Sequence, residues 1–134
     1  MSAASHHRDL IVRSIHASLV GDSSIVEGLF SPEVQAWLPV HAPSAVAVAV
    51  EIEDGCGAFV DVSVGTLQSG TIGPCTWVEW FASATHVGEI VIEDTVFSPT
   101  GRRTVLHGVT FAEFDGDQIV AYRQSWESAE LGLP

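Results

Sequence analysis

A chain of 134 residues is long enough to bury a substantial core but too short for separate cofactor and substrate domains. Hydrophobic residues make up 46% of it, which is typical of a packed globular protein. Acidic residues number 17 against 5 basic ones, and the resulting formal net charge of -12 argues against nucleic acids and anionic membranes as partners. We therefore expect a single domain over residues 1–134, with no nucleic-acid partner and no membrane contact.

The residue types also argue against most cofactors. All five basic residues are arginines, so the chain has no lysine for a Schiff base or a phosphate-binding loop. The stretch 55–57 lacks the third glycine of a dinucleotide fingerprint, and the six histidines show no metal-ligand spacing. Cys56 and Cys75 form no C-x-x-C pair, and the N-terminus has no signal-like apolar segment. We expect no cofactor, no metal and a cytoplasmic location.

The first third of the chain is expected to be mainly helical. After a tail over residues 1–7, residues 9–22 carry apolar side chains near helical spacing. Two short helical turns are expected over 23–30 and 31–40, because a serine can cap each and Pro39 can end the second.

The stretch PSAVAVAVEIEDG, residues 43–55, is ambiguous. Its alternation of valine and alanine is typical of a strand. Ser44 as an N-cap and Gly55 as a C-terminal stop favour a helix instead. The residues by themselves leave both alternatives open.

The rest of the chain predicts long strands. Residues 59–68, 75–86, 102–114 and 118–127 are rich in β-branched and aromatic side chains and are separated by glycine, proline or Asp-Gly. Helices followed by such strands define an α+β protein, with its N-terminal helices packed on one face of a curved antiparallel sheet.

One predicted strand is apolar on both faces. Trp77 and Phe81 lie on one side of it, and Val78, Trp80 and His86 lie on the other. If the helices cover one face, a second copy of the chain is the simplest cover for the other. We therefore predict a homodimer through the open sheet face.

Several segments resemble the SnoaL-like branch of the NTF2-like superfamily: EWFASATHVG, SPTGRRTV, HGVTFAEFDGDQIVAYRQSWE and the opening LFSPEVQAWLP. The resemblance covers most of the chain. It implies a curved sheet wrapped round a cone-shaped pocket, dimerisation through the open face, and a helix over residues 44–54. Members include polyketide cyclases, ketosteroid isomerases, epoxide hydrolases and binding proteins without chemistry, so the site must decide the function.

The acids that this family uses are replaced here. By the resemblance, Ser14 stands where ketosteroid isomerases have a tyrosine, and Leu38 stands where their aspartate base precedes a proline. Thr110 stands where isomerases and cyclases have a further aspartate. Enolisation needs a carboxylate to take a proton from carbon, and a threonine cannot do so near neutral pH.

His86 is the remaining candidate for proton transfer, because its reference pKa lies near working pH. The alternative is that it fastens the loop 87–100 by a backbone hydrogen bond. A ligand pocket is predicted around it, with ordinary core packing as the alternative. The predicted pocket residues are Trp37, Leu38, Trp80, Thr110, Tyr122, Gln124 and Trp126.

The charged residues of the strands allow further alternatives. Arg123 and Glu79 could form an internal ion pair, anchor a substrate or take part in a dimer contact. His107 and Glu113 share one face of their strand, opposite Thr110, and are expected to face the partner subunit.

Two hypotheses follow for function. In the first, the protein binds a small hydrophobic molecule, such as a polyketide-like or terpenoid compound, without catalysis. In the second, it is a cyclase- or isomerase-like enzyme that uses His86 with a helper hydroxyl such as Thr110 or Tyr122.

Overall fold

The computed structural model describes residues 3–38, 41–54, 58–92 and 94–127. The helical elements of these residues are α1 (Ala3–Val20), η1 (Ser23–Ile25), α2 (Val26–Leu29) and α3 (Ala45–Asp54). The strands are β1 (Phe30–Trp37), β2 (His41–Ala42), β3 (Phe59–Ile72), β4 (Cys75–His86), β5 (Ile90–Ile92), β6 (Thr95–Phe97), β7 (Arg103–Asp115) and β8 (Gln118–Glu127).

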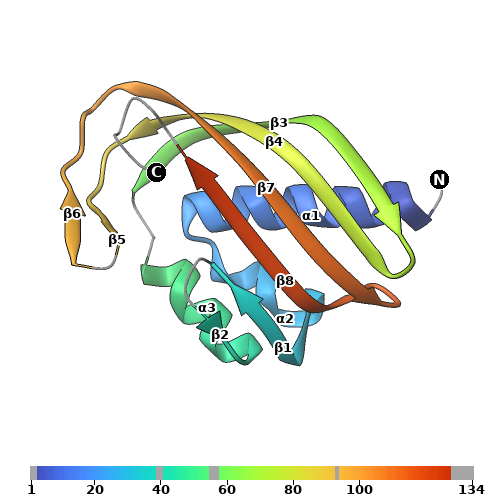
Figure 1. Ribbon diagram of the computed structural model, residues 1–134. Coiled ribbons are helices and arrows are strands. Elements are labelled where there is room, and N and C mark those ends of the chain that lie inside the picture. The colour runs from blue at the N-terminus through green and yellow to red at the C-terminus, as the bar shows by residue number, and fades with distance from the viewer. Residues whose placement is uncertain (1–2, 39–40, 55–57, 93, 128–134) are drawn as a thin grey trace.

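The strands form one large curved sheet and one small one. The large sheet has the order β2-β1-β8-β7-β4-β3, and β5 pairs only with β6. Helix α1 lies along the concave side of the large sheet, and α3 lies near β1 and β2 (Figure 1). This is the α+β arrangement that the sequence predicts, with the helices on one face.

The sheet is mixed rather than purely antiparallel, which corrects our expectation. Its neighbouring strands pair antiparallel except for β1 and β8, which run parallel. The stretch expected to form a second helical turn, residues 31–40, is instead strand as far as Trp37. Val34 and Ala36 are buried while Gln35 between them is exposed, so the local period is two and not 3.6.

Helix α1 begins earlier than the sequence suggests. Residues 3–7, expected to belong to a tail, form its first turns. His7 explains this start, because its ring stacks on Phe114 with 3.9 Å between ring centroids and its Nε2 lies 2.8 Å from the carbonyl oxygen of Gly116. These contacts hold the start of α1 against the turn between β7 and β8.

The ambiguous stretch 43–55 is helical over Ala45–Asp54, as the family resemblance implies. Ser44 caps it, since its Oγ accepts a hydrogen bond from the N–H of Ala47 over 3.1 Å. Val48 and Ile52, four residues apart, are buried, whereas Val46 is 76% exposed. The helical period therefore decides which of the alternating valines enter the core.

Irregularities in β3 contribute to the curvature of the sheet. The pairing of β3 with β4 shifts between Val60 and Ser63 and again between Thr66 and Gln68. Asp61 in the first shift has a φ of 53°, and Arg103 Nη1 donates to its carbonyl oxygen over 2.8 Å. Extra residues at such bulges bend the strand and increase its twist.

No helix within the described residues is both long enough and apolar enough to cross a membrane.

Candidate functional site

A chain of four neutral polar side chains links α1 to β8 on the covered face of the sheet. Ser14 Oγ lies 2.9 Å from the Tyr122 hydroxyl, which donates to Gln124 Oε1 over 2.7 Å. Gln124 Nε2 then donates to Ser18 Oγ over 2.9 Å. Ser14, Tyr122 and Gln124 are all buried, so these hydrogen bonds are shielded from water.

Every side-chain oxygen and nitrogen of this chain has a hydrogen-bond partner. The phenol of Tyr122 has one hydrogen and gives it to Gln124, so Ser14 must donate to the phenol oxygen. The hydroxyl hydrogen of Ser14 is shared between the phenol oxygen and the carbonyl oxygen of Ile11, which lies 2.7 Å from Ser14 Oγ. The hydroxyl of Ser18 donates to the carbonyl oxygen of Ile15 over 2.9 Å. A chain in which every member has a partner fastens a helix to a strand, so its first role is structural.

Tyr122 is a neutral phenol at physiological pH. Burial raises its pKa well above the ordinary value of about 10, and hydrogen bonds with Ser14 and Thr110 oppose this rise without cancelling it. Tyr122 can therefore donate a hydrogen bond, but it does not supply a base.

Trp80 fills the middle of the covered face of the sheet. Its indole is fully buried, and Nε1–H donates to Thr110 Oγ1 over 3.0 Å. Gly108, its partner on β7, makes room for the ring, because a Cβ at this position would overlap the indole. Thr110 therefore accepts a hydrogen bond at the position where the sequence resemblance implied an aspartate in isomerases and cyclases.

His86 ends β4 and is fully buried. Its Nδ1 accepts a hydrogen bond from the backbone N–H of Thr100 over 3.3 Å. Its backbone N–H donates to the carbonyl oxygen of Arg102, and its carbonyl oxygen accepts from the N–H of Gly101. The backbone fastening expected as the structural role of His86 is thus present at Nδ1.

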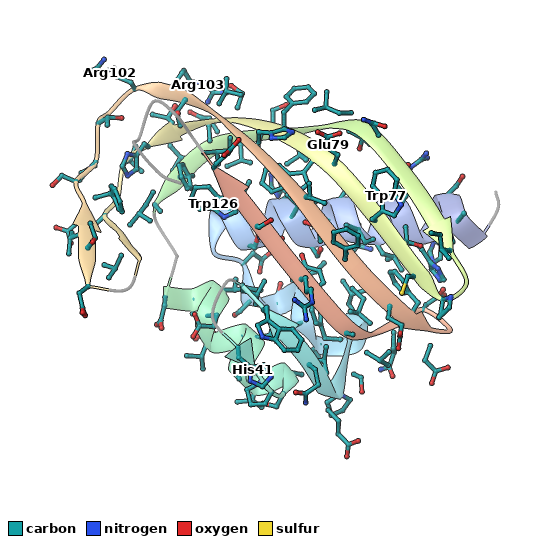
Figure 2. All side chains as sticks on the ribbon, in the orientation of Figure 1. His41, Trp77, Glu79, Arg102, Arg103 and Trp126 are labelled. Carbon is teal, nitrogen blue, oxygen red and sulfur yellow. The ribbon has the colours of Figure 1, made fainter. Side chains whose placement is uncertain are left out.

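The other nitrogen of His86 has no such role. Among the described residues, Nε2 of His86 is the buried side-chain nitrogen or oxygen atom that lacks a hydrogen-bond partner. The ring of Phe59 lies 5.6 Å from the imidazole and 6.0 Å from Trp126, which it meets edge-on. We call these three residues the His86 cluster; Trp126 marks its place near the end of β8 in Figure 2.

The imidazole of His86 is far from Thr110 along the sheet. Thr110 lies opposite Val78 in the pairing of β4 with β7, and His86 is eight residues further along β4 (86 − 78). At about 3.3 Å per residue this corresponds to about 26 Å along the strand. Curvature shortens the direct path, but it does not bring Thr110 or Tyr122 within hydrogen-bond reach of the imidazole.

The predicted pocket residues therefore separate into groups. Trp80, Thr110, Tyr122 and Gln124 lie together in the middle of the covered face, Trp126 lies in the His86 cluster, and Leu38 packs against the core.

Trp37 belongs to the opposite face, so its assignment to the pocket is wrong. It pairs with Arg123, whose guanidinium carbon lies 4.4 Å from the centre of the indole, and it stacks on His41. Arg123 is exposed on the open face, and residues paired across neighbouring strands share a face.

Arg123 and Glu79 have separate partners, so of the three alternatives for these residues the ion pair between them is not formed. Glu79 Oε2 lies 2.8 Å from Nε2 of His107, and its Oε1 accepts from Gln68 over 3.0 Å. His107 Nδ1 lies 3.8 Å from Glu127. These groups lie on the open face, away from the covered side of the sheet.

Ser18, Phe59 and Thr100 were not predicted as site residues. Ser18 could have been found, because Ser14 and Ser18 are four residues apart on the buried side of an amphipathic helix. Phe59 and Thr100 carry no comparable signal, since their contacts with His86 depend on strand register and on the path of a loop.

Comparisons with known proteins identify the fold. No family model matches the chain, and no curated protein matches its sequence. Among solved structures, AclR from Streptomyces galilaeus, a suggested hydroxylase, has 20% identity and a TM-score of 0.73, with 98% of this chain and 100% of that chain covered.

Two further structures place this fold in a wider group. A SnoaL-like polyketide cyclase from Agrobacterium tumefaciens has 11% identity and a TM-score of 0.66, with 90% of this chain and 91% of that chain covered. The protein Rd1NTF2_04 has 15% identity and a TM-score of 0.58 over 92% of this chain and 100% of that chain. The chain therefore has the NTF2-like fold in the form shared with SnoaL-like proteins. At these identities the likeness shows the fold, and the function must be argued from the site.

Proposed function

We propose that this protein binds a small, mainly apolar molecule at the His86 cluster. The observation that carries the proposal is the unpartnered Nε2 of a fully buried histidine. A buried polar atom without a partner costs about 1–3 kcal/mol, and a ligand atom that pairs with it removes this cost. Phe59 and Trp126 offer aromatic surface beside it, which suits a flat or ring-containing ligand.

The buried polar groups favour binding without catalysis. Those of the described residues are Ser14, Thr76, His86, Thr104, Thr110 and Gln124, and none is a carboxylate. Carbanion chemistry of the isomerase or aldol type needs such a base. The similar structure from Agrobacterium tumefaciens is a polyketide cyclase, so we propose a polyketide-like ligand, with a terpenoid as the alternative.

Binding can be tested with three carbonyl-containing probes: 9-fluorenone, 9,10-anthraquinone and camphor. We expect at least one to bind wild-type protein with micromolar affinity, measured by calorimetry and by quenching of tryptophan fluorescence. His86→Phe should weaken binding, whereas Val46→Ser on the exposed side of α3 should leave it unchanged. The absence of binding by all three probes up to their solubility limits would contradict the proposal.

We also propose that two copies associate through the open face of the sheet. Phe81, Val105 and Phe111 are 41%, 52% and 49% exposed there. Isolated apolar side chains are common on surfaces, but a group on adjacent strands favours an interface. The glycine beneath Phe81, Gly65, lets the ring lie flat against the sheet, which keeps this face smooth.

A further inference from the structure

We infer that His86 is held as the tautomer with its hydrogen on Nε2, so the ligand must present an acceptor oxygen to it. This inference rests on the proposed function, because it names the chemical group that the same site recognises. It assigns Thr100 the role of a positioning residue for the imidazole.

The tautomer follows from the partner of Nδ1. A neutral imidazole has one N–H and one nitrogen lone pair. The backbone N–H of Thr100 donates to Nδ1 over 3.3 Å, which requires the lone pair to be there. The hydrogen must then sit on Nε2, the buried atom that has no partner.

The position of Thr100 does not depend on the imidazole alone. The two residues after Thr100 are tied to the backbone of His86. The N–H of Gly101 donates to the carbonyl oxygen of His86 over 2.8 Å, and the N–H of His86 donates to the carbonyl oxygen of Arg102 over 3.1 Å. Opposite these bonds, the N–H groups of Val87 and Gly88 donate to the carbonyl oxygen of Ala58. The backbone therefore presents a fixed donor to Nδ1 before any ligand is bound.

A fixed Nε2–H determines what the site can recognise. A ketone, quinone, ether or phenolate oxygen can accept this hydrogen bond. An ammonium group, or a methylene in place of the carbonyl, leaves the donor unpaired. In this tautomer Nε2 already carries a hydrogen and cannot take a proton from a ligand, so His86 does not act as a base there. The Nε2–H group would instead donate a hydrogen bond to a ligand oxygen that carries negative charge.

The tautomer can be measured without a ligand. In ¹⁵N-labelled protein, long-range ¹H–¹⁵N NMR spectra distinguish a protonated from an unprotonated ring nitrogen. We expect Nδ1 of His86 to be unprotonated and Nε2 to be protonated at neutral pH, with assignment by loss of the signals in His86→Phe. Protonation at Nδ1 instead would overturn the inference while leaving the proposed function intact.

The ligand class can be measured with 9-fluorenone and fluorene, which have nearly the same shape and differ in the carbonyl oxygen. We expect fluorenone to bind wild-type protein about tenfold more tightly, the value of one buried hydrogen bond. His86→Asn keeps an acceptor near Nδ1 for Thr100 but removes the Nε2 donor, so the preference should disappear. His86→Gln places an amide donor near the position of Nε2, so part of the preference should remain.

The outcomes separate the two ideas. Equal affinities of fluorenone and fluorene in wild-type protein, or a preference that persists in His86→Asn, would overturn the inference but not the proposed function. Failure of both compounds and of the other probes to bind would overturn the proposed function, and the ligand part of the inference with it. The wild-type comparison decides the matter even if a variant fails to fold, which circular dichroism would reveal.

Discussion

Two fully buried side chains, Tyr122 and His86, differ in how their polar atoms are satisfied. The Tyr122 hydroxyl has hydrogen-bond partners on both α1 and β8, which makes it part of the scaffold. His86 has a partner at Nδ1 and none at Nε2, so one half of the ring belongs to the scaffold and the other half keeps an unpaired polar atom. At the scale of single residues, the unsatisfied atom is therefore a better guide to function than the residue type.

The phenol of Tyr122 should remain neutral in the folded protein well above pH 10. Burial raises its pKa in the folded state, while the unfolded phenol ionises at its ordinary value of about 10. Above that pH the unfolded chain releases a proton that the folded chain keeps. The free energy of unfolding should then fall as the pH rises, whereas below pH 10 this group contributes no pH dependence.

Absorbance at 295 nm can follow this ionisation directly, because Tyr122 is the single tyrosine of the chain. We expect the absorbance to rise together with the loss of native circular dichroism. Tyr122→Phe should abolish the signal. A reversible transition near pH 10 in protein that keeps its native circular dichroism would show that the phenol is accessible.

At the scale of elements, glycines opposite aromatic side chains allow the strands to pack closely. A Cβ at position 108 would overlap the buried Trp80 indole and lie 2.6 Å from the carbonyl oxygen of Ser125. Neither the buried indole nor the backbone carbonyl can move easily, so Gly108→Ala should lower the free energy of unfolding by about 1–3 kcal/mol.

Gly65→Ala is the matched control for this prediction. Its Cβ would overlap only the end of the Phe81 ring, which is 41% exposed and can turn outwards. We expect a loss of under about 1 kcal/mol, measured for both variants by urea denaturation. Equal losses would mean that the surroundings of Trp80 can relax as freely as the open face.

The long strands could be predicted from the sequence because their alternation is regular. The four segments expected as strands lie within observed strands, except that Arg102 precedes the start of its strand. The observed strands are Phe59–Ile72, Cys75–His86, Arg103–Asp115 and Gln118–Glu127. Strand β1 was missed, since Ser31 and Pro32 resemble the start of a helix and its pairing is with β8, far away in the sequence. Local patterns do not contain such long-range partners.

The site was predictable in part for the same reason. Alternation correctly placed Tyr122 and Gln124 on the same face as each other, and it placed His107 opposite Thr110. Alternation does not determine the distance between sites on one face, so His86 could be combined with Thr110 in a single hypothesis. The register of β4 with β7 separates them.

At the scale of the whole molecule, charge is unevenly distributed. The formal net charge of -12 makes copies of the chain repel one another in most orientations. On the open face, the positive charges of Arg103 and Arg123 offset part of the negative charge of Glu79, Glu113 and Glu127. Glu79 is also paired with His107. Two of the five arginines are thus on this one face, where like-charge repulsion between two copies is reduced.

We therefore expect a homodimer at micromolar concentration in analytical ultracentrifugation. Phe111→Glu should shift the protein towards monomer, because it places a desolvated carboxylate within the proposed interface, while its exposure and the adjacent Arg123 allow the single chain to fold. Val46→Glu, at a position 76% exposed on α3, adds the same charge elsewhere and should leave the dimer intact. Wild-type protein that sediments as a monomer at these concentrations would contradict the expectation and would leave the apolar side chains of the open face facing water.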